Sequence, residues 1–185
     1  VGTASGKPYF ESAGKLVPER CGDENSVGMI KFYRTDCFDD IGGFVRELNW
    51  DGIDGHLCRM NGWKAVSWDD PEVRFLHLRP MGTSHKNWWT GRVRHGTGQH
   101  YTGTGPIYLL ASAGARLFHP PVVVGSLAMM WGYFRGFLTR APRYPDLEFR
   151  RFLRRYQHRS LLVGKARATR ELDARQAHLL HNTQT

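Results

Sequence analysis

The fold is decided by residues 50–63, which read WDGIDGHLCRMNGW. Apolar side chains recur there at intervals of four and three residues, the spacing of one helix face: Ile53, Leu57 and Met60. Gly62 follows them, and glycine is a common stop signal just past a helix. The pattern therefore predicts a helix over residues 51–61 with one buried face.

Two carboxylates, Asp51 and Asp54, fall in the first turn of this predicted helix. The free amides and the dipole at a helix N-terminus stabilise a nearby carboxylate and keep it ionised. An ionised and positioned carboxylate can act as a general base that takes a proton from an attacking hydroxyl. The alternative is that Asp51 only caps the helix and that Asp54 is a solvated acid, and spacing alone leaves both interpretations open.

Further elements are expected on both sides of this helix. Residues 1–27 are rich in Gly, Ser, Pro and charge, which predicts loops with short extended pieces. The other patterns predict a strand over 27–34, a short helix over 36–41 that starts at an Asp36 cap and stops at Gly42-Gly43, a strand over 73–78, a Gly-rich basic loop with some helix over 79–105, and helices over 106–118, 121–138 and 148–177. The predicted fold class is therefore α/β, followed by basic helices.

Charge is distributed unevenly along the chain. Its 185 residues include 26 Lys and Arg against 17 Asp and Glu, a net charge of +9. Residues 1–73 hold 8 basic and 13 acidic side chains, a net of −5, whereas residues 74–185 hold 18 and 4, a net of +14. With 41% apolar and 12% aromatic residues, the composition excludes a disordered chain. A half this basic needs an anionic partner: nucleic acid, a nucleotide or sugar diphosphate, or an anionic membrane leaflet.

Basic side chains gather in the Gly-rich segment and the strand before it: His77, Arg79, His85, Lys86, Arg92, Arg94 and His95. Guanidinium forks and backbone amides recognise phosphate, and a solvated basic face is the alternative. Arg92 and Arg94 are two residues apart, so in an extended segment both would project to one side. Nearby aromatic side chains would either stack on a base or sugar or belong to the core: Trp88, Trp89 and Tyr101.

The later helical regions are candidates for contact with an anionic surface. The apolar stretch 120–134 is shorter than the roughly 20 residues that cross a bilayer. It is consistent with a buried helix or with an interfacial membrane helix, because three basic residues follow it: Arg135, Arg140 and Arg143. Further on, three arginines share one helix face, either solvated or turned toward an anion: Arg151, Arg155 and Arg159.

Cysteine and histidine patterns argue against a disulfide or zinc scaffold. The three cysteines, at 21, 37 and 58, form no CxxC pair, which favours a reducing compartment. The sequence contains no DxD, P-loop or GxSxG motif. His77 and His85 are eight residues apart with no acidic residue close in sequence, so no metal ligands are predicted in this chain.

Five short segments stand in the order and spacing of the second half of a family 2 glycosyltransferase: 31–34 (KFYR), 38–44 (FDDIGGF), 50–51 (WD), 59–63 (RMNGW) and 75–77 (FLH). The chain therefore resembles that family from about Gly28 to Arg159. Residues 77–82 (HLRPMG) resemble one bacterial branch of it, of the polysaccharide and glycolipid type. The resemblance implies a partial GT-A fold, with residues 1–105 as the C-terminal part of the catalytic domain and 106–185 as a helical, basic, membrane-associated extension.

The resemblance also implies roles for individual residues. The family's catalytic base lies eleven residues before the glycine that ends its helix, and this spacing selects Asp51. The Glu that precedes the base in the family is Trp50 here, so Asp54 stays the alternative base. Candidate contacts to substrate or diphosphate are Trp50, His77, Arg79, Arg92 and Arg94. A divalent metal, Mg²⁺ or Mn²⁺, is expected for the complete enzyme, with ligands that are not in this chain.

The leading prediction is inverting transfer of a sugar from a nucleotide-diphospho-sugar to an acceptor hydroxyl. The acceptor is expected to be a lipid-linked sugar or a polysaccharide, in the cytoplasm at the inner face of the cell membrane, with no nucleic-acid partner. The family's nucleotide-binding half would precede Val1, so the chain alone is expected to be inactive. Two alternatives remain: a nucleic-acid-binding module with interleaved Trp, Arg and Tyr, and a non-catalytic peripheral membrane scaffold that uses residues 122–138.

Overall fold

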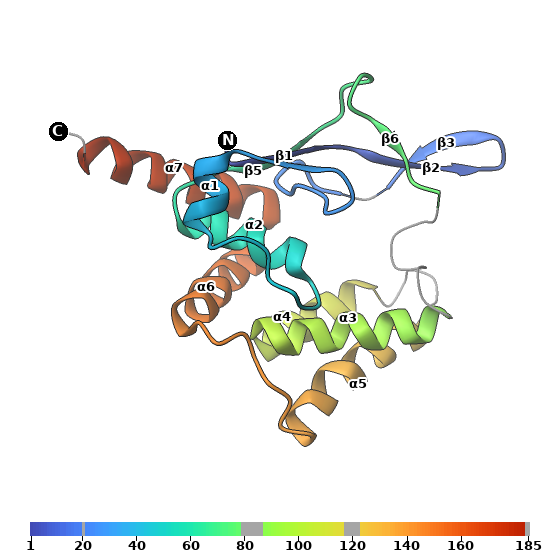
Figure 1. The fold of residues 1–185 in the computed structure, drawn as a ribbon. Coiled ribbons are helices and arrows are strands. Elements are labelled where there is room, and N and C mark those ends of the chain that lie inside the picture. The colour runs from blue at the N-terminus through green and yellow to red at the C-terminus, as the bar shows by residue number, and fades with distance from the viewer. Residues whose placement is uncertain (20, 79–86, 117–122, 184–185) are drawn as a thin grey trace. The chain divides into compact units, whose positions relative to one another are not determined.

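The computed structural model describes residues 1–19, 21–78, 87–116 and 123–183. These residues form seven helices and two three-stranded sheets, so the predicted mixed α/β class is confirmed (Figure 1). The chain divides into two compact units: unit 1 comprises 1–45, 50–80 and 163–185, and unit 2 comprises 46–49 and 81–162. The boundary that the sequence predicts between a catalytic domain and a helical extension lies after residue 105. This position falls inside unit 2.

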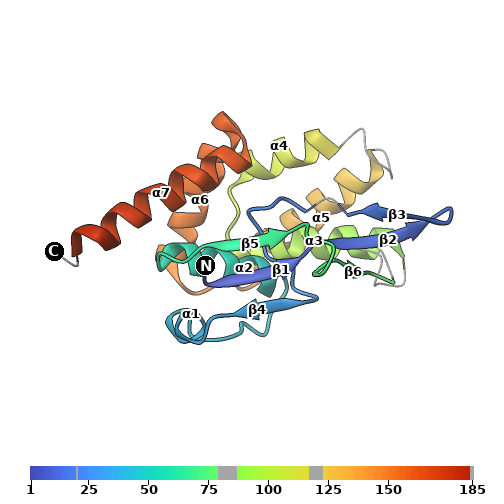
Figure 2. The same cartoon turned by 90° about the horizontal axis from the view of Figure 1, so that it is seen from above.

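The first sheet of unit 1 has the strand order β4-β1-β5, with β1 (Thr3–Gly6) in the centre (Figure 2). β4 (Lys31–Tyr33) runs antiparallel to β1, and β5 (Ala65–Trp68) runs parallel to it. The hydroxyl of Ser5 accepts a hydrogen bond of 2.9 Å from the amide of Val27. This bond ties the segment that leads into β4 to the central strand.

The second sheet of unit 1 has the strand order β3-β2-β6. β2 (Pro8–Ser12) and β3 (Lys15–Pro18) form a hairpin. The two turn residues, Ala13 and Gly14, both have positive φ values, 51° and 72°, as a two-residue type I′ hairpin requires. β6 (Phe75–Leu76) pairs in parallel with β2.

Three helices complete unit 1: α1 (Thr35–Asp40), α2 (Trp50–Met60) and α7 (Lys165–Thr183). α2 buries Ile53 and Leu57, as the spacing of its apolar residues predicts. Cys37 of α1 and Cys58 of α2 are fully buried free thiols whose sulfur atoms lie 3.3 Å apart. The two helices are therefore in close contact at this point.

Unit 2 is built from four helices: α3 (Trp88–Thr102), α4 (Pro106–Arg116), α5 (Val124–Leu138) and all but the last residue of α6 (Leu147–Val163). Its core forms where Leu109 and Ala113 of α4 pack against Met129 and Tyr133 of α5. The Tyr133 hydroxyl donates a hydrogen bond of 2.6 Å to the Thr104 carbonyl, which satisfies a polar atom inside this apolar core.

Most of the predicted helices are confirmed. Those expected over 36–41, 51–61, 106–118 and 121–138 appear, within the described residues, as α1, α2, α4 and α5. α1 does end at Gly42 and Gly43, but its N-cap is Arg34 and no side chain caps it, so the predicted Asp36 cap is wrong. The helix expected over 148–177 is two helices, because Gly164 breaks it with a φ of +83°.

The extended segments differ more from expectation. The strand expected over 27–34 shortens to the three residues of β4, and the one over 73–78 shortens to the two residues of β6. β5 is not anticipated by the sequence pattern. Between residues 87 and 105 the expectation of a Gly-rich loop with some helix underestimates the helix, since most of this stretch is the fifteen-residue helix α3.

Candidate functional site

The N-terminal turn of α2 is surrounded by aromatic rings from the segment before it. Gly42 and Gly43 turn the chain after α1, with φ values of +74° and +79°. Four rings then meet edge to face, with centroids 4.9–5.5 Å apart: Tyr33, Phe38, Phe44 and Trp50. Such pairs contribute about 0.5–1.5 kcal/mol each beyond area burial. They fix Trp50, the first residue of α2, beside β4.

Asp54 is one of the two predicted carboxylates, and it is fully buried. One oxygen lies 2.5 Å from the Nζ of Lys31, whose side chain is equally buried, and the other accepts a hydrogen bond from the Tyr33 hydroxyl. Burial raises the pKa of Asp54, and the ammonium of Lys31 opposes that rise. Asp54 is therefore a paired interior carboxylate, not the solvated first-turn acid of the alternative interpretation.

Asp51 has a different environment one turn earlier. Its side chain is half-buried, and its Oδ1 accepts a hydrogen bond of 3.0 Å from the Gly52 amide. Within the described part of the chain, no donor is bonded to its Oδ2. Gly28 lies against this residue, because a Cβ there would come within 2.9 Å of the Asp51 Cβ and 3.3 Å of its Oδ2. A glycine at 28 thus lets the neighbouring segment pass close to Asp51.

Lys31 connects the two carboxylate positions. Its Nζ bonds the backbone carbonyl of Asp51 at 3.1 Å as well as the side chain of Asp54. It also lies 6.0 Å from the centroid of the Trp50 ring. No motif in the sequence marks Lys31 and Tyr33 as site residues, although their spacing of two on a strand places both side chains on one face.

The C-terminal end of α2 is fixed by Arg59, whose side chain is only 2% exposed. Its guanidinium donates to the carbonyl of Glu24 and, at 2.9 Å, to that of Ala65. Its Nε lies 3.5 Å from the carboxylate of Asp173 on α7. Burial raises the pKa of Asp173, and Arg59 opposes that rise. Anchors at both ends therefore hold the position of α2, and with it the direction of Asp51.

His77 follows β6 in the other sheet of unit 1. Its Nδ1 lies 3.1 Å from the Oε2 of Glu19, and its amide donates to the Tyr9 carbonyl at 2.6 Å. The structure thus gives His77 a carboxylate partner and does not bring it into any described contact with Asp51. Its predicted role in substrate binding remains a prediction. Arg79, with His85 and Lys86, lies outside the described residues.

Arg92 and Arg94 lie on α3 in unit 2. Two residues along a helix correspond to a rotation of about 200°, so the two side chains leave opposite sides of α3. The expectation that both project to one side of an extended segment is therefore wrong. Arg94 is exposed and Arg92 is half-buried.

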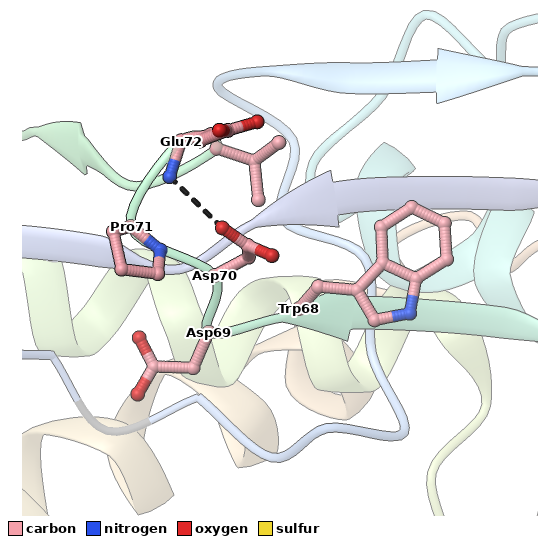
Figure 3. Close-up of a pocket in the computed structure, with 6 residues that line it drawn as sticks. Trp68, Asp69, Asp70, Pro71 and Glu72 are labelled. Carbon is pink, nitrogen blue, oxygen red and sulfur yellow. Dashed lines mark hydrogen bonds between the residues drawn. The ribbon is translucent and has the colours of Figure 1, made fainter.

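A shallow hollow in unit 1 lies in the turn between β5 and β6 (Figure 3). It is lined by residues 68–73, none of which the sequence analysis selects. Asp70 accepts a hydrogen bond of 3.0 Å from the Glu72 amide. Hydrogen bonds from the Tyr9 hydroxyl and from Arg74 to Asp69, both 2.8 Å, lower the pKa of Asp69. The Asp-Asp-Pro sequence is typical of a turn, and these bonds account for the acidic residues there.

In the described part of the chain, no three His, Cys, Asp or Glu side chains gather to hold a metal ion. Metal dependence is expected of a complete enzyme, so this finding leaves that prediction as it stands. Among the same residues, no helix combines the length and apolar character needed to cross a bilayer.

Comparison with known proteins gives no match: no protein-family model, no curated protein and no solved structure matches the chain. The resemblance to family 2 glycosyltransferases therefore depends on the five segments quoted above. Function is argued from those segments and from the surroundings of α2.

Proposed function

We propose that the chain forms the acceptor side of an inverting family 2 glycosyltransferase with a GT-A fold, and that Asp51 is its general base. The observation that carries the proposal is the contrast between the two carboxylates of α2. Asp51 is half-buried and, among the described residues, has one carboxylate oxygen outside any hydrogen bond. Asp54 is buried and paired with Lys31. Only Asp51 offers an oxygen that an acceptor hydroxyl could reach.

In the proposed reaction, Asp51 takes the proton of the acceptor hydroxyl. The hydroxyl oxygen attacks the anomeric carbon of the donor on the face opposite the diphosphate, so the configuration inverts. The bond between the anomeric carbon and the diphosphate oxygen breaks, and the nucleoside diphosphate leaves with the electron pair. A divalent metal, Mg²⁺ or Mn²⁺, would neutralise the charge on that leaving group in the complete enzyme.

The convergence of separate segments on α2 supports the proposal. The KFYR segment supplies Lys31 and Tyr33, which hold Asp54. The FDDIGGF segment supplies two of the rings near Trp50. The RMNGW segment begins on α2 itself, where its Arg59 anchors the end of the helix to Ala65 and Asp173. If Asp51 is the base, its position must be fixed closely, because misplacement of a reacting group by about 1 Å can lower a rate 100-fold.

The proposal also covers partners and location. The donor is a nucleotide-diphospho-sugar, and the acceptor is a lipid-linked sugar or a polysaccharide at the cytoplasmic face of the cell membrane. His77, Arg79, Arg92 and Arg94 are the proposed contacts to substrate or diphosphate. Because Arg92 and Arg94 leave opposite sides of α3, one diphosphate would contact at most one of them.

The test is sugar transfer by the gene product that contains this chain, measured with radiolabelled nucleotide-sugars and a membrane extract as the source of acceptors. Asp51→Asn removes the proposed base and keeps the shape of the side chain. We expect a loss of about 10²–10⁴-fold in turnover, the usual contribution of a general base. Unchanged turnover in this variant would refute the assignment.

A matched control is needed for Asp54, because Asp54→Asn alone would leave the buried charge of Lys31 unpaired and cost about 3–5 kcal/mol of stability. The double substitution Lys31→Gln with Asp54→Asn removes both charges and keeps polar groups of similar size. We expect this variant to retain measurable turnover wherever its circular dichroism shows a folded protein. If the folded double variant were as inactive as Asp51→Asn, Asp54 would take the place of Asp51 as the base.

A further inference from the structure

The two faces of α5 are unusual for a helix in water. Its buried face carries mostly small residues: Gly125, Ser126, Ala128, Gly132 and Gly136. Gly132 of α5 and Gly96 of α3 let the backbones of the two helices touch. A Cβ on Gly132 would lie 2.0 Å from the carbonyl oxygen of Val93, and a Cβ on Gly96 would lie 1.9 Å from that of Met129. Close approach through small residues is the packing typical of helices in lipid.

Two large side chains of α5, Met129 and Tyr133, are buried in the core of unit 2, but the exposed face carries large apolar residues as well. Five of them follow one another at intervals of three or four residues along one side of the helix: Val124, Leu127, Trp131, Phe134 and Leu138. Leu127 is 54% exposed, Trp131 52% and Leu138 74%. A surface helix in water carries charged and polar side chains on the face opposite the core, whereas α5 carries this apolar row there. A continuous apolar stripe of this kind marks an interaction site.

The charged residues on α5 and just after it are all positive. Arg135 on α5 and Arg140 just after it are exposed. No Asp or Glu occurs between residues 81 and 145. Unit 2 as a whole has 13 basic against 3 acidic side chains, a net charge of +10. The partner that covers the stripe must therefore be apolar and carry negative charge.

We propose that α5 docks on an anionic lipid surface, with its apolar stripe in the boundary between head groups and acyl chains and its arginines at the phosphates. A helix with an apolar face, a tryptophan and adjacent basic residues binds membranes in this way. A second copy of the chain fits less well, because it would bring the same positive charges together. A nucleic acid would leave the aliphatic side chains of the stripe in water.

The test is flotation of the purified chain with lipid vesicles, either neutral phosphatidylcholine or phosphatidylcholine with 30% phosphatidylglycerol (about this fraction suffices for an anionic surface). We expect binding to the anionic vesicles that weakens as salt is added. Leu127→Glu with Trp131→Glu should lower that binding at least about tenfold, since each side chain contributes apolar burial. Arg135→Glu with Arg140→Glu should remove the preference for anionic lipid.

The matched control is Leu161→Glu with Leu162→Glu on α6, two side chains that are also exposed. This variant should float as the wild type does, and circular dichroism should report that all variants are folded. The proposal is overturned if the wild type does not float, or if the variant Leu127→Glu with Trp131→Glu floats like the control. It is also overturned if the wild type is a dimer that does not float and this variant is a monomer, because the stripe would then be a dimer interface. Docking does not depend on the proposed catalysis, so Asp51→Asn should float normally whether or not Asp51 is the base.

Discussion

Asp51 and Asp54 are three residues apart on one helix, yet their surroundings differ in kind. The sequence predicts both in the first turn of a helix; both lie on α2, but only Asp51 is in its first turn, and Asp54 follows one turn later. It does not reveal that Lys31 and Tyr33 reach Asp54 from a strand more than twenty residues away. Which side chains of another element reach a carboxylate depends on strand order and register. Strand order and register follow from tertiary packing, and no local sequence pattern specifies them.

His56, on the same helix, provides a prediction at the residue scale. Desolvation of its ring, with the nearby charges of Arg59, Lys165 and Lys31, lowers the pKa of His56 to about 3. In the unfolded chain the pKa is about 6.5. Below that pH the His56 ring binds a proton in the unfolded state but stays neutral in the folded state. The stabilising contribution is therefore present above about pH 6.5 and is lost as the pH falls toward 3.

We expect His56→Gln to make stability less sensitive to acid. Between pH 7 and pH 5 the wild type should lose about 1–2 kcal/mol more than this variant. Thermal unfolding followed by circular dichroism at pH 7, 6 and 5 measures the difference. His158→Gln, at an exposed position on α6, is the control and should follow the wild type. Parallel losses in wild type and His56→Gln would show that His56 is protonated in the folded chain.

At the scale of elements, α3 is the helix that the sequence predicts least well, since only some helix within a Gly-rich loop is expected over 79–105. Gly91, Gly96 and Gly98 lie within it, and glycine lowers helix stability by about 1 kcal/mol per residue relative to alanine. The structure accounts for Gly96, since any side chain there would meet the backbone of α5. Tertiary contact therefore overrides local propensity. By contrast, α2 and α4 are predicted well because their apolar spacing and end signals agree with each other.

Close contact between α3 and α5 leads to a prediction for Gly132. Gly132→Ala would place a methyl group 2.0 Å from the Val93 carbonyl oxygen, so the helices must move apart. We expect a loss of about 1–3 kcal/mol in the free energy of unfolding, measured with urea. Gly114→Ala on α4 is the matched control, because no atom lies within 4 Å of its added Cβ. That variant should gain about 0.5–1 kcal/mol, and equal effects of the two substitutions would contradict the described packing.

At the scale of the whole molecule, net charge differs less between the two units than between the two parts of the sequence, because residues 74–80 and 163–185, which carry a basic excess, belong to unit 1. Unit 2 has a net charge of +10, and unit 1 has 13 basic against 14 acidic side chains, a net of −1. The excess of unit 2 includes the exposed face of α6 that the sequence predicts, formed by Arg151, Arg155 and Arg159. The sequence shows that the later residues are basic. It does not show that 163–185 join unit 1, since this depends on the chain turning back after Gly164.

Binding to polyanions tests whether the positive charge of unit 2 acts without specificity. We expect unit 2 to bind single-stranded DNA, double-stranded DNA and heparin with similar, weak affinity. Affinity should fall at least about tenfold between 50 and 200 mM salt, because released counterions supply the binding energy. Fluorescence anisotropy of labelled oligonucleotides measures it, and Arg151→Glu with Arg155→Glu should weaken all three equally. A preference for single strands that survives 200 mM salt would favour the nucleic-acid-binding alternative.

The contact between Arg59 and Asp173 has a consequence for the order in which the chain becomes structured. Arg59 fixes the end of the helix that carries Asp51, and its carboxylate partner is 114 residues further along the chain. A ribosome adds about 5–20 residues per second, so the partner emerges several seconds after Arg59. During that interval Arg59 relies on backbone carbonyls alone. Residues 81–162, which make up nearly all of unit 2, are synthesised between the two, so unit 1 acquires this ion pair only after unit 2 has had time to fold.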